Sequence, residues 1–406
     1  MRVKSFTKDI DFLIIFSLVS LFVLSIFSIY SAGYPRGMEN IAFTQIIWFC
    51  TGMIILVVTQ FISMKSVLAL SNLFYAVLII MLLLVFLIGS VRMGAKRWIE
   101  IGSFQFQPSE LGKFLLLCTL ARYYSAGKIH WNDKKYAIFG SVLTIIPCIL
   151  VLKQPDLGTA IIYIFIFIAV IYSAGLPYFY LFNLAALSFF LFAKGIGDQF
   201  FITALVIYGI VLYKFSVKIT AGIALWSTGL ILGIASNMFW EGLKEYQKMR
   251  LLTFLDPEKF SKDGGWQIIQ AKTAVSNGDL QGMGFMNGSQ TQLRFLPEGH
   301  TDFIFSVIAE EFGLIGIIIL FIAFTILFYR LVKIVSKTRS RYLYLLGSGI
   351  TALLIFQTVL NISISLGLLP VTGLPLPLVS YGGSALMMNM LMIGIVMNIG
   401  KHENNI

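Results

Sequence analysis

The sequence predicts an all-α polytopic membrane protein with about twelve transmembrane helices. Of the 406 residues, 58% are hydrophobic and 12% are charged, against about 45–50% apolar and about 25% charged residues in soluble domains. Apolar runs of about 20 residues, the length that crosses about 30 Å of hydrocarbon, recur along the chain. Short polar turns separate these runs, as expected for helices that satisfy their own backbone hydrogen bonds within lipid.

The apolar runs place the spans in order. They lie at 10–32, 41–62, 67–89, 109–126, 137–152, 157–175, 177–193, 199–213, 219–239, 303–330, 342–366 and 382–400. The first run follows a basic segment but lacks a convincing small-residue cleavage site, so we expect a retained span and not a signal peptide.

Turn and helix-start signals set the ends of the later spans. Pro108, followed by an acidic residue, starts the fourth span, because both are favoured in the first turn of a helix. A Pro- and Gly-containing interruption at 153–159 separates the fifth and sixth spans, and short turns between 175 and 218 separate the next three. The long loop 240–302 precedes the tenth span. A broken apex at 368–383 precedes the last one.

Basic residues predict the orientation. Twelve spans put both termini on one side, and the positive-inside rule makes that side cytoplasmic because the short loops on it are basic, as at Lys333 and Arg339. The net charge of +11 is therefore explained by membrane topology, and we expect no nucleic-acid partner. The chain is expected to form one integral membrane domain, 1–406, with 240–302 as a large extracytoplasmic loop within it.

Several common sites are missing from the sequence. There is no P-loop, no G-x-S-x-G elbow and no H-E-x-x-H motif, and the chain has only three His. Cys50, Cys118 and Cys148 all lie inside apolar runs, so we expect neither a disulfide framework nor a metal cluster. Chemistry in this chain would have to use carboxylates and cations.

The segment 92–113 concentrates cations on the external side. Arg97 lies among aromatic residues, which is typical either of a solvated loop with an interfacial aromatic belt or of a site for a phosphate attached to an apolar chain. Lys113 follows Glu110 at i+3 on one helix face within an apolar run. The pair is either a structural ion pair or the wall of a polar cavity, and we favour the cavity.

Asp156 lies between two apolar runs in the segment 153–159. It could be a turn or N-cap residue, which would contribute about 1 kcal/mol to helix stability. The alternative is a partner for the cationic segment, because a charged pair at a membrane edge is not explained by turn chemistry alone.

Asp302 lies where the long loop enters an apolar run. One interpretation is that Asp302, with Thr301, does no more than cap the following helix. The other is a functional site, which an acid at a membrane boundary indicates. Small residues fall near its helix face at 306, 309, 313 and 316, a stripe that permits close packing or lines a cleft.

The apex 368–383 is rich in Pro and Gly at membrane depth. Such broken backbone is tolerated only when it is buried in protein or lines a cavity. We expect it to form part of the wall of a cleft, with Ser380 and Tyr381 as its polar candidates.

Together these segments resemble the SEDS family, named for shape, elongation, division and sporulation. The matching segments are Arg97-Trp98, Gln107-Pro-Ser-Glu110 with Lys113, Gln154-Pro-Asp-Leu-Gly-Thr159, the run 247–270, Gly288-Ser-Gln290, 296–313 and 370–383. The run 288–297 resembles the rod-shape elongation branch more than the division branch. Family members usually have ten spans, so the stretch between Asp156 and Tyr246 is expected to hold an additional pair.

The resemblance implies a peptidoglycan glycosyltransferase in the bacterial cytoplasmic (inner) membrane, with its active site on the extracytoplasmic face. Such an enzyme polymerises lipid II into β-1,4 glycan strands. A sugar hydroxyl attacks an anomeric carbon and expels a lipid diphosphate, which requires a base and cations. The implied partners are lipid II, the nascent glycan strand, membrane lipids, a class B penicillin-binding protein as transpeptidase, and the cytoskeletal elongation proteins of the rod complex.

The resemblance also assigns roles to residues. Asp302 is the expected general base. Arg97 and Lys113 are expected at the diphosphate, with Glu110 and Asp156 orienting them and Ser380 as a further substrate-binding residue. No cofactor is expected with certainty; a divalent cation, Mg or Mn, could share the charge of the diphosphate.

A lipid II flippase or other transporter is the main alternative. A flippase needs a polar path through both leaflets, whereas the candidate residues here cluster at one face. That asymmetry favours an enzyme that works from the outside.

Overall fold

The computed structural model describes residues 11–92, 95–102, 104–127, 134–215, 219–242, 245–260 and 264–403, so the predicted basic segment before the first span lies outside them. Helices make up almost all of the described structure. They are α2 (Phe12–Gly33), η1 (Tyr34–Arg36), α3 (Asn40–Thr59), α4 (Met64–Ile88), α5 (Pro108–Ser125), α6 (Lys134–Lys153), α7 (Leu157–Ser173), α8 (Tyr178–Ile196), α9 (Asp198–Lys214), α10 (Ile219–Gly242), α11 (Glu245–Leu255), α12 (Gly265–Asn277), α13 (Ser289–Gln292), α14 (Ile304–Ser336), α15 (Arg341–Ser365) and α16 (Gly383–Glu403).

Each of the twelve predicted spans coincides with a helix, which confirms the all-α fold class. Among the described residues, eight helices are long and apolar enough to cross a membrane. They are α2, α3, α4, α6, α10, α14, α15 and α16. The apolar helix α7 has only 17 residues, and α5 carries three charged side chains, so neither meets that criterion. Length and composition together therefore support eight spans among the described residues.

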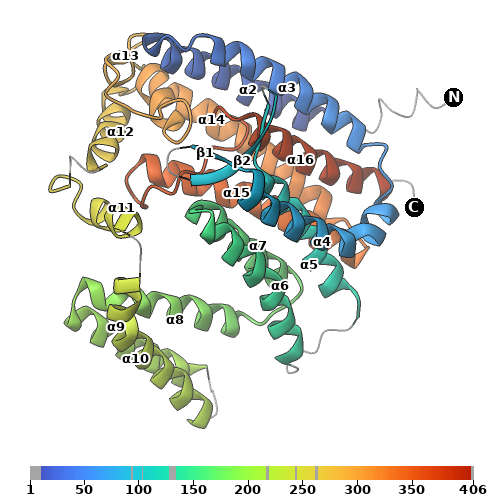
Figure 1. Cartoon of the computed structure of the whole chain (residues 1–406), viewed down its shortest axis with the longest axis vertical. Coiled ribbons are helices and arrows are strands. Elements are labelled where there is room, and N and C mark those ends of the chain that lie inside the picture. Colours follow the sequence, from blue (N-terminus) through green and yellow to red (C-terminus); the bar gives the residue numbers. More distant parts are fainter. Residues whose placement is uncertain are drawn as a thin grey trace. The chain divides into compact units, whose positions relative to one another are not determined.

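The chain divides into two compact units. The first contains Met1–Ala174 and Thr253–Ile406, and the second contains Gly175–Leu252. In the first unit α2 packs on α14, α3 on α16, and α15 on both α5 and α7 (Figure 1). In the most apolar stretch of each helix, 61% of α15 and 78% of α16 is buried, so these two helices form the centre of the first unit.

A small sheet follows α4. Strands β1 (Ser90–Arg92), β2 (Ala95–Ile101) and β3 (Phe104–Phe106) pair antiparallel in the order β1-β2-β3. The sequence predicted only a loop here. The pairing fixes the direction of β2, which carries Arg97.

Helix α14 is broken at Gly313, where the sequence predicted a continuous span. Gly313 adopts φ 60° and ψ −155°, a backbone conformation that is strongly unfavourable for residues with a side chain. The glycine-rich segment 278–284 fills the break: Met283 and Gly284 donate their N–H groups to the carbonyls of Glu310 and Glu311, at 2.9 and 3.0 Å. Backbone groups that the helix leaves unpaired are thereby satisfied.

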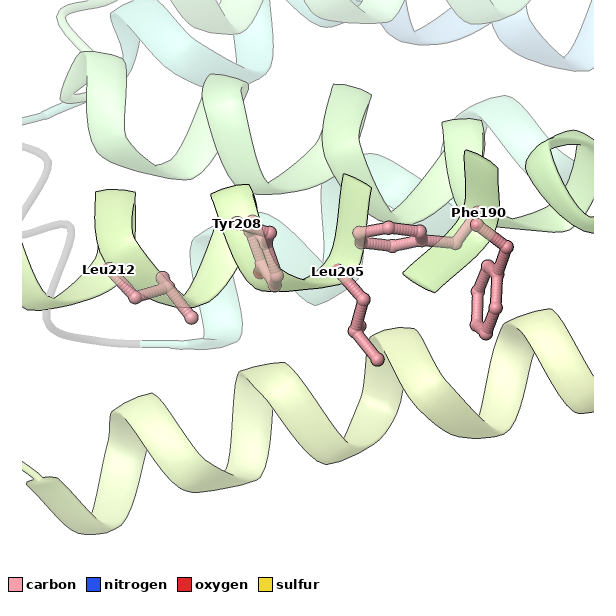
Figure 2. Packing of buried hydrophobic residues seen from close by; sticks show 5 residues of the cluster. Phe190, Leu205, Tyr208 and Leu212 are labelled. Atoms are coloured by element: carbon pink, nitrogen blue, oxygen red, sulfur yellow. The ribbon is translucent and has the colours of Figure 1, made fainter. Parts of the chain in front are cut away.

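The second unit packs α8, α9 and α10 together. Its core contains Phe190, Leu205, Tyr208 and Leu212, as Figure 2 shows. Gly229 of α10 leaves space for the Phe190 ring, because a Cβ added there would lie 2.9 Å from that ring. Small residues allow such close packing in helices that lack a hydrophobic driving force for association.

Candidate active site

Asp302 lies in the turn that leads into α14 and is half-buried. Phe303 occupies the N-cap position of α14 and makes no side-chain cap bond, so the capping alternative for Asp302 gains no support. A Cβ added at Gly373 would lie 3.8 Å from Oδ2 of Asp302, which places the carboxylate beside the apex loop.

Three consecutive carbonyl groups around Asp302 are each held from the apex loop or α15. The N–H of Tyr381 donates to the carbonyl of His300 at 2.9 Å. The Ser380 hydroxyl donates to the carbonyl of Thr301 at 2.5 Å. The side-chain amide of Asn361 donates to the carbonyl of Asp302 at 2.9 Å. The main chain that carries the carboxylate is therefore fixed on a scaffold.

The Ser380 hydroxyl has a structural role. Besides donating to Thr301, it accepts the N–H of Leu376 at 2.8 Å, which closes the apex loop on itself. The expectation that Ser380 binds substrate stays a prediction.

Arg97 and Asp156 lie together, as expected for a charged pair. Nη1 of Arg97 is 3.8 Å from Oδ1 of Asp156, and Nε donates to the carbonyl of Gln154 at 3.2 Å. A further bond joins Nη2 to the carbonyl of Pro155. The Arg97 side chain remains 26% exposed, so one cation of the site is open to solvent.

Asp156 also caps α7, which confirms the N-cap expectation. Its carboxylate accepts the N–H and the hydroxyl of Thr159, at 3.1 and 2.9 Å. Gln107 donates to Oδ2, the oxygen that also accepts the Thr159 hydroxyl, at 3.0 Å. Both predicted roles of Asp156 are therefore compatible: its carboxylate caps α7 and also contacts Arg97 and Gln107.

Glu110 and Lys113 form a buried ion pair. Nζ of Lys113 lies 2.6 Å from Oε1 of Glu110, and both side chains are almost fully excluded from solvent. The helix geometry of α5 produces the i+3 contact, as the spacing predicted. Burial at this depth requires pairing, because an isolated ion is strongly penalised.

The apex loop contacts the segment that carries Asp156 and the segment that carries Asp302. A Cβ added at Gly158, in the first turn of α7, would lie 2.6 Å from the carbonyl of Thr372. The next residue in the loop, Gly373, lies beside the Asp302 carboxylate. The loop therefore joins the segment of Asp156 to the segment of Asp302.

Sequence reasoning did not predict the roles of two buried residues, one in α15 and one in α14. Asn361 lies within an apolar run, and this unusual placement was the available signal. Glu310 accepts the N–H groups of Gln290 and Thr291, at 2.7 and 3.1 Å, and so anchors the start of α13. Its partner segment is distant in sequence, so nothing local indicated the contact.

His300 lies next to this site and is partly buried. Burial lowers the pKa of His300 below its ordinary value, the Arg36 guanidinium lowers it further, and Glu298 opposes both effects. Its Nδ1 atom has no hydrogen-bond partner in the structure.

The described residues contain no group of three or more His, Cys, Asp or Glu side chains arranged to hold a metal ion. A divalent cation that shares the charge of the diphosphate stays a prediction.

Comparison with known proteins extends over nearly the whole chain. Residues 9–197 and 186–405 match the FtsW/RodA/SpoVE family model, described as a cell cycle protein. The chain is 32% identical over 442 residues to the peptidoglycan glycosyltransferase RodA of Treponema pallidum (strain Nichols), with 99% of this chain and 100% of that protein covered. It is 34% identical over 389 residues to the peptidoglycan glycosyltransferase MrdB of Escherichia coli (strain K12), with 95% and 92% covered.

Solved structures share the fold. One, described as structural coordination of polymerization and crosslinking by a peptidoglycan synthase complex, aligns with a TM-score of 0.74 and 26% identity over 97% of this chain and 98% of the other. The rod shape determining protein RodA of Thermus thermophilus aligns with a TM-score of 0.63 and 25% identity, over 97% of each chain.

Proposed function

This chain belongs to the FtsW/RodA/SpoVE family of cell cycle proteins, and from that premise we propose how it acts as a peptidoglycan glycosyltransferase. The resemblance to the SEDS family is confirmed, and the similar proteins are named as the elongation-type enzymes RodA and MrdB. The activity is glycan polymerisation; the roles of individual residues are the proposal.

Asp302 acts as the general base. It takes the proton from the 4-hydroxyl of the acceptor sugar as that oxygen attacks the anomeric carbon of the lipid II donor. The bond to the lipid diphosphate breaks on the opposite side, so one displacement inverts an α-linked donor into a β-1,4 product. The observation that carries this role is the clamp on the carbonyls of residues 300–302, because a fixed base is what a displacement of this kind requires.

Arg97 contacts the departing diphosphate. Its guanidinium is partly exposed and is oriented by Asp156 and two carbonyls, and such a planar donor suits phosphate oxygens. Lys113 is the second proposed contact, with Glu110 orienting it. That pair is buried. In this proposal, the diphosphate of lipid II contacts Lys113 by entering between the helices that surround the pair.

The expected topology completes the proposal. Twelve spans place both termini in the cytoplasm, and the loop 240–302 and the Asp302 site at the outer face of the bacterial cytoplasmic membrane. The basic loops between the spans support this orientation. Lipid II and the glycan strand then bind outside, where the cell wall grows.

A class B penicillin-binding protein is the proposed partner, together with other proteins of the rod complex. A solved structure with this fold is a peptidoglycan synthase complex that coordinates polymerization and crosslinking. Such a partner would crosslink the strands that this chain polymerises.

The test uses purified full-length protein and lipid II, with and without the transpeptidase partner. We expect glycan polymer from the wild type and none from Asp302→Asn, with lipid II binding and thermal unfolding of the variant unchanged. Wild-type protein that makes no polymer with any partner, yet moves lipid II across vesicles, would establish the flippase alternative instead.

A further inference from the structure

Asn361 joins two segments of the site through one side chain. Its amide nitrogen donates to the carbonyl of Asp302 at 2.9 Å and to the carbonyl of Leu374 at 2.8 Å. Asn361 is fully buried in α15. One side chain of α15 therefore connects the turn that carries Asp302 to the apex loop.

Three buried polar atoms on α14 and α15 have no hydrogen-bond partner in the protein. Oδ1 of Asn361, Oγ of Ser306 and Oε1 of Gln357 are all buried and make no hydrogen bond to protein. Helices α14 and α15 are consecutive, joined by a short turn and packed together, so they run antiparallel. Four residues forward from Asp302 and four back from Asn361 bring Ser306 level with Gln357.

Buried polar atoms are nearly always paired with protein or ordered water. Ser306 and Gln357 are each four residues, about one helix turn, from Asp302 and Asn361, so the three buried oxygen atoms without a protein partner lie close to this junction along α14 and α15.

We propose that Asn361 is a positioning residue for Asp302. Its amide links the carbonyl of Asp302 to the carbonyl of Leu374. Leu374 follows Gly373, the residue beside which the Asp302 carboxylate lies. This role rests on the proposed function, in which Asp302 is the base. Losing the amide removes one of the three bonds that hold the turn, the one made to the Asp302 carbonyl itself, and a misplacement of about 1 Å can slow a reaction by about 10²-fold.

The chain offers a matched control. Asn398 of α16 is also fully buried, and its amide donates to two carbonyls, those of Thr59 at 2.5 Å and Ile62 at 2.8 Å. Its Oδ1 likewise has no partner. Asn398 therefore makes the same set of interactions as Asn361, but holds the end of α3 instead of the Asp302 turn.

The experiment compares Asn361→Ala with Asn398→Ala in the full chain with its transpeptidase partner. Thermal unfolding in detergent should fall by similar amounts. For Asn361→Ala we expect kcat for lipid II polymerisation to fall about 30- to 100-fold with KM within about twofold, because the base moves while the substrate contacts stay. For Asn398→Ala we expect kcat within about twofold of the wild type.

A second pair of variants covers a failure to fold. Asn361→Ser and Asn398→Ser each keep one donor, and the same split in kcat is expected at smaller size. Equal losses of kcat in the two members of a pair, or a rise in KM with unchanged kcat, would overturn the proposal.

Asp302→Asn, measured beside them, separates the two ideas. If Asp302→Asn keeps wild-type kcat, the proposed function fails. If Asp302→Asn is inactive and Asn361→Ala is as active as Asn398→Ala, only the positioning role fails.

Discussion

Glu310 and Thr291 form a buried junction between the broken helix α14 and the loop that precedes it. The carboxylate accepts the hydroxyl of Thr291 at 2.7 Å and its N–H at 3.1 Å. A Cβ added at Gly288 would lie 2.6 Å from the same carboxylate, so glycine at this position lets the loop approach Glu310 closely.

Replacing Glu310 should destabilise the protein. Glu310→Ala leaves the N–H groups of Gln290 and Thr291 buried without a partner, which costs about 2–4 kcal/mol of unfolding free energy. Thermal unfolding in detergent measures this. The exposed Glu258→Ala is the control and should shift stability by no more than about 0.5 kcal/mol.

Gly313→Ala should loosen the segment 278–284. An added Cβ would lie 2.3 Å from the backbone nitrogen of Gly282 at a positive φ of 60°. Gly37→Ala is the control, since Gly37 shares the positive φ but has open space around the added atom. We expect limited proteolysis to cut 278–288 faster in the Gly313 variant alone. Equal cutting in both would mean that strain, and not the clash, is the cause.

The Glu110–Lys113 pair can be tested for structure against function. Removing either partner alone should destabilise by about 3–5 kcal/mol, because an uncompensated charge stays buried. The double variant Glu110→Gln/Lys113→Met should recover most of that stability. If it also recovers polymerisation, the pair is structural; we expect it to remain inactive because Lys113 is lost from the diphosphate site.

Arg97→Lys should weaken substrate binding. Arg97 uses three different nitrogens for Asp156 and the carbonyls of Gln154 and Pro155. A lysine has a single nitrogen and does not reproduce this planar fork, so we expect KM for lipid II to rise about tenfold, or about 1.4 kcal/mol. Arg122→Lys makes the same change at the far end of α5 and should leave KM unaltered. Steady-state polymerisation assays compare the two.

His300 should make stability sensitive to acid. Its pKa in the folded state is lowered, chiefly by burial, so below the ordinary value of about 6.5 the unfolded chain binds more protons. The stability contribution is complete above about pH 6.5 and is lost as the pH falls through the folded-state pKa. Thermal unfolding at pH 7.5 and 5.5 should show this loss in the wild type and less of it in His300→Gln.

Local patterns predicted much of the fold and part of the site. Apolar runs located the helices, the Pro108 start located α5, and the i+3 spacing of Glu110 and Lys113 predicted their contact. The Asp156 cap was also readable, since its partner is three residues away. These features depend only on neighbours within one or two helix turns.

The break in α14 escaped sequence reasoning for a related reason. A continuous apolar run indicates a continuous helix, and Gly313 alone does not interrupt it. The break exists because the backbone of 278–284 satisfies the groups that it exposes. That partner comes from a separate part of the loop.

The sequence by itself determined that this chain is a helical membrane protein with an acidic residue, Asp302, at the end of a long loop. Only the tertiary structure decided what holds that residue. The bond from Asn361 spans 59 positions, and the apex loop joins Asp302 to the segment of Asp156. Hydrogen bonds between distant segments depend on how the helices pack, and no local pattern of residues records that packing.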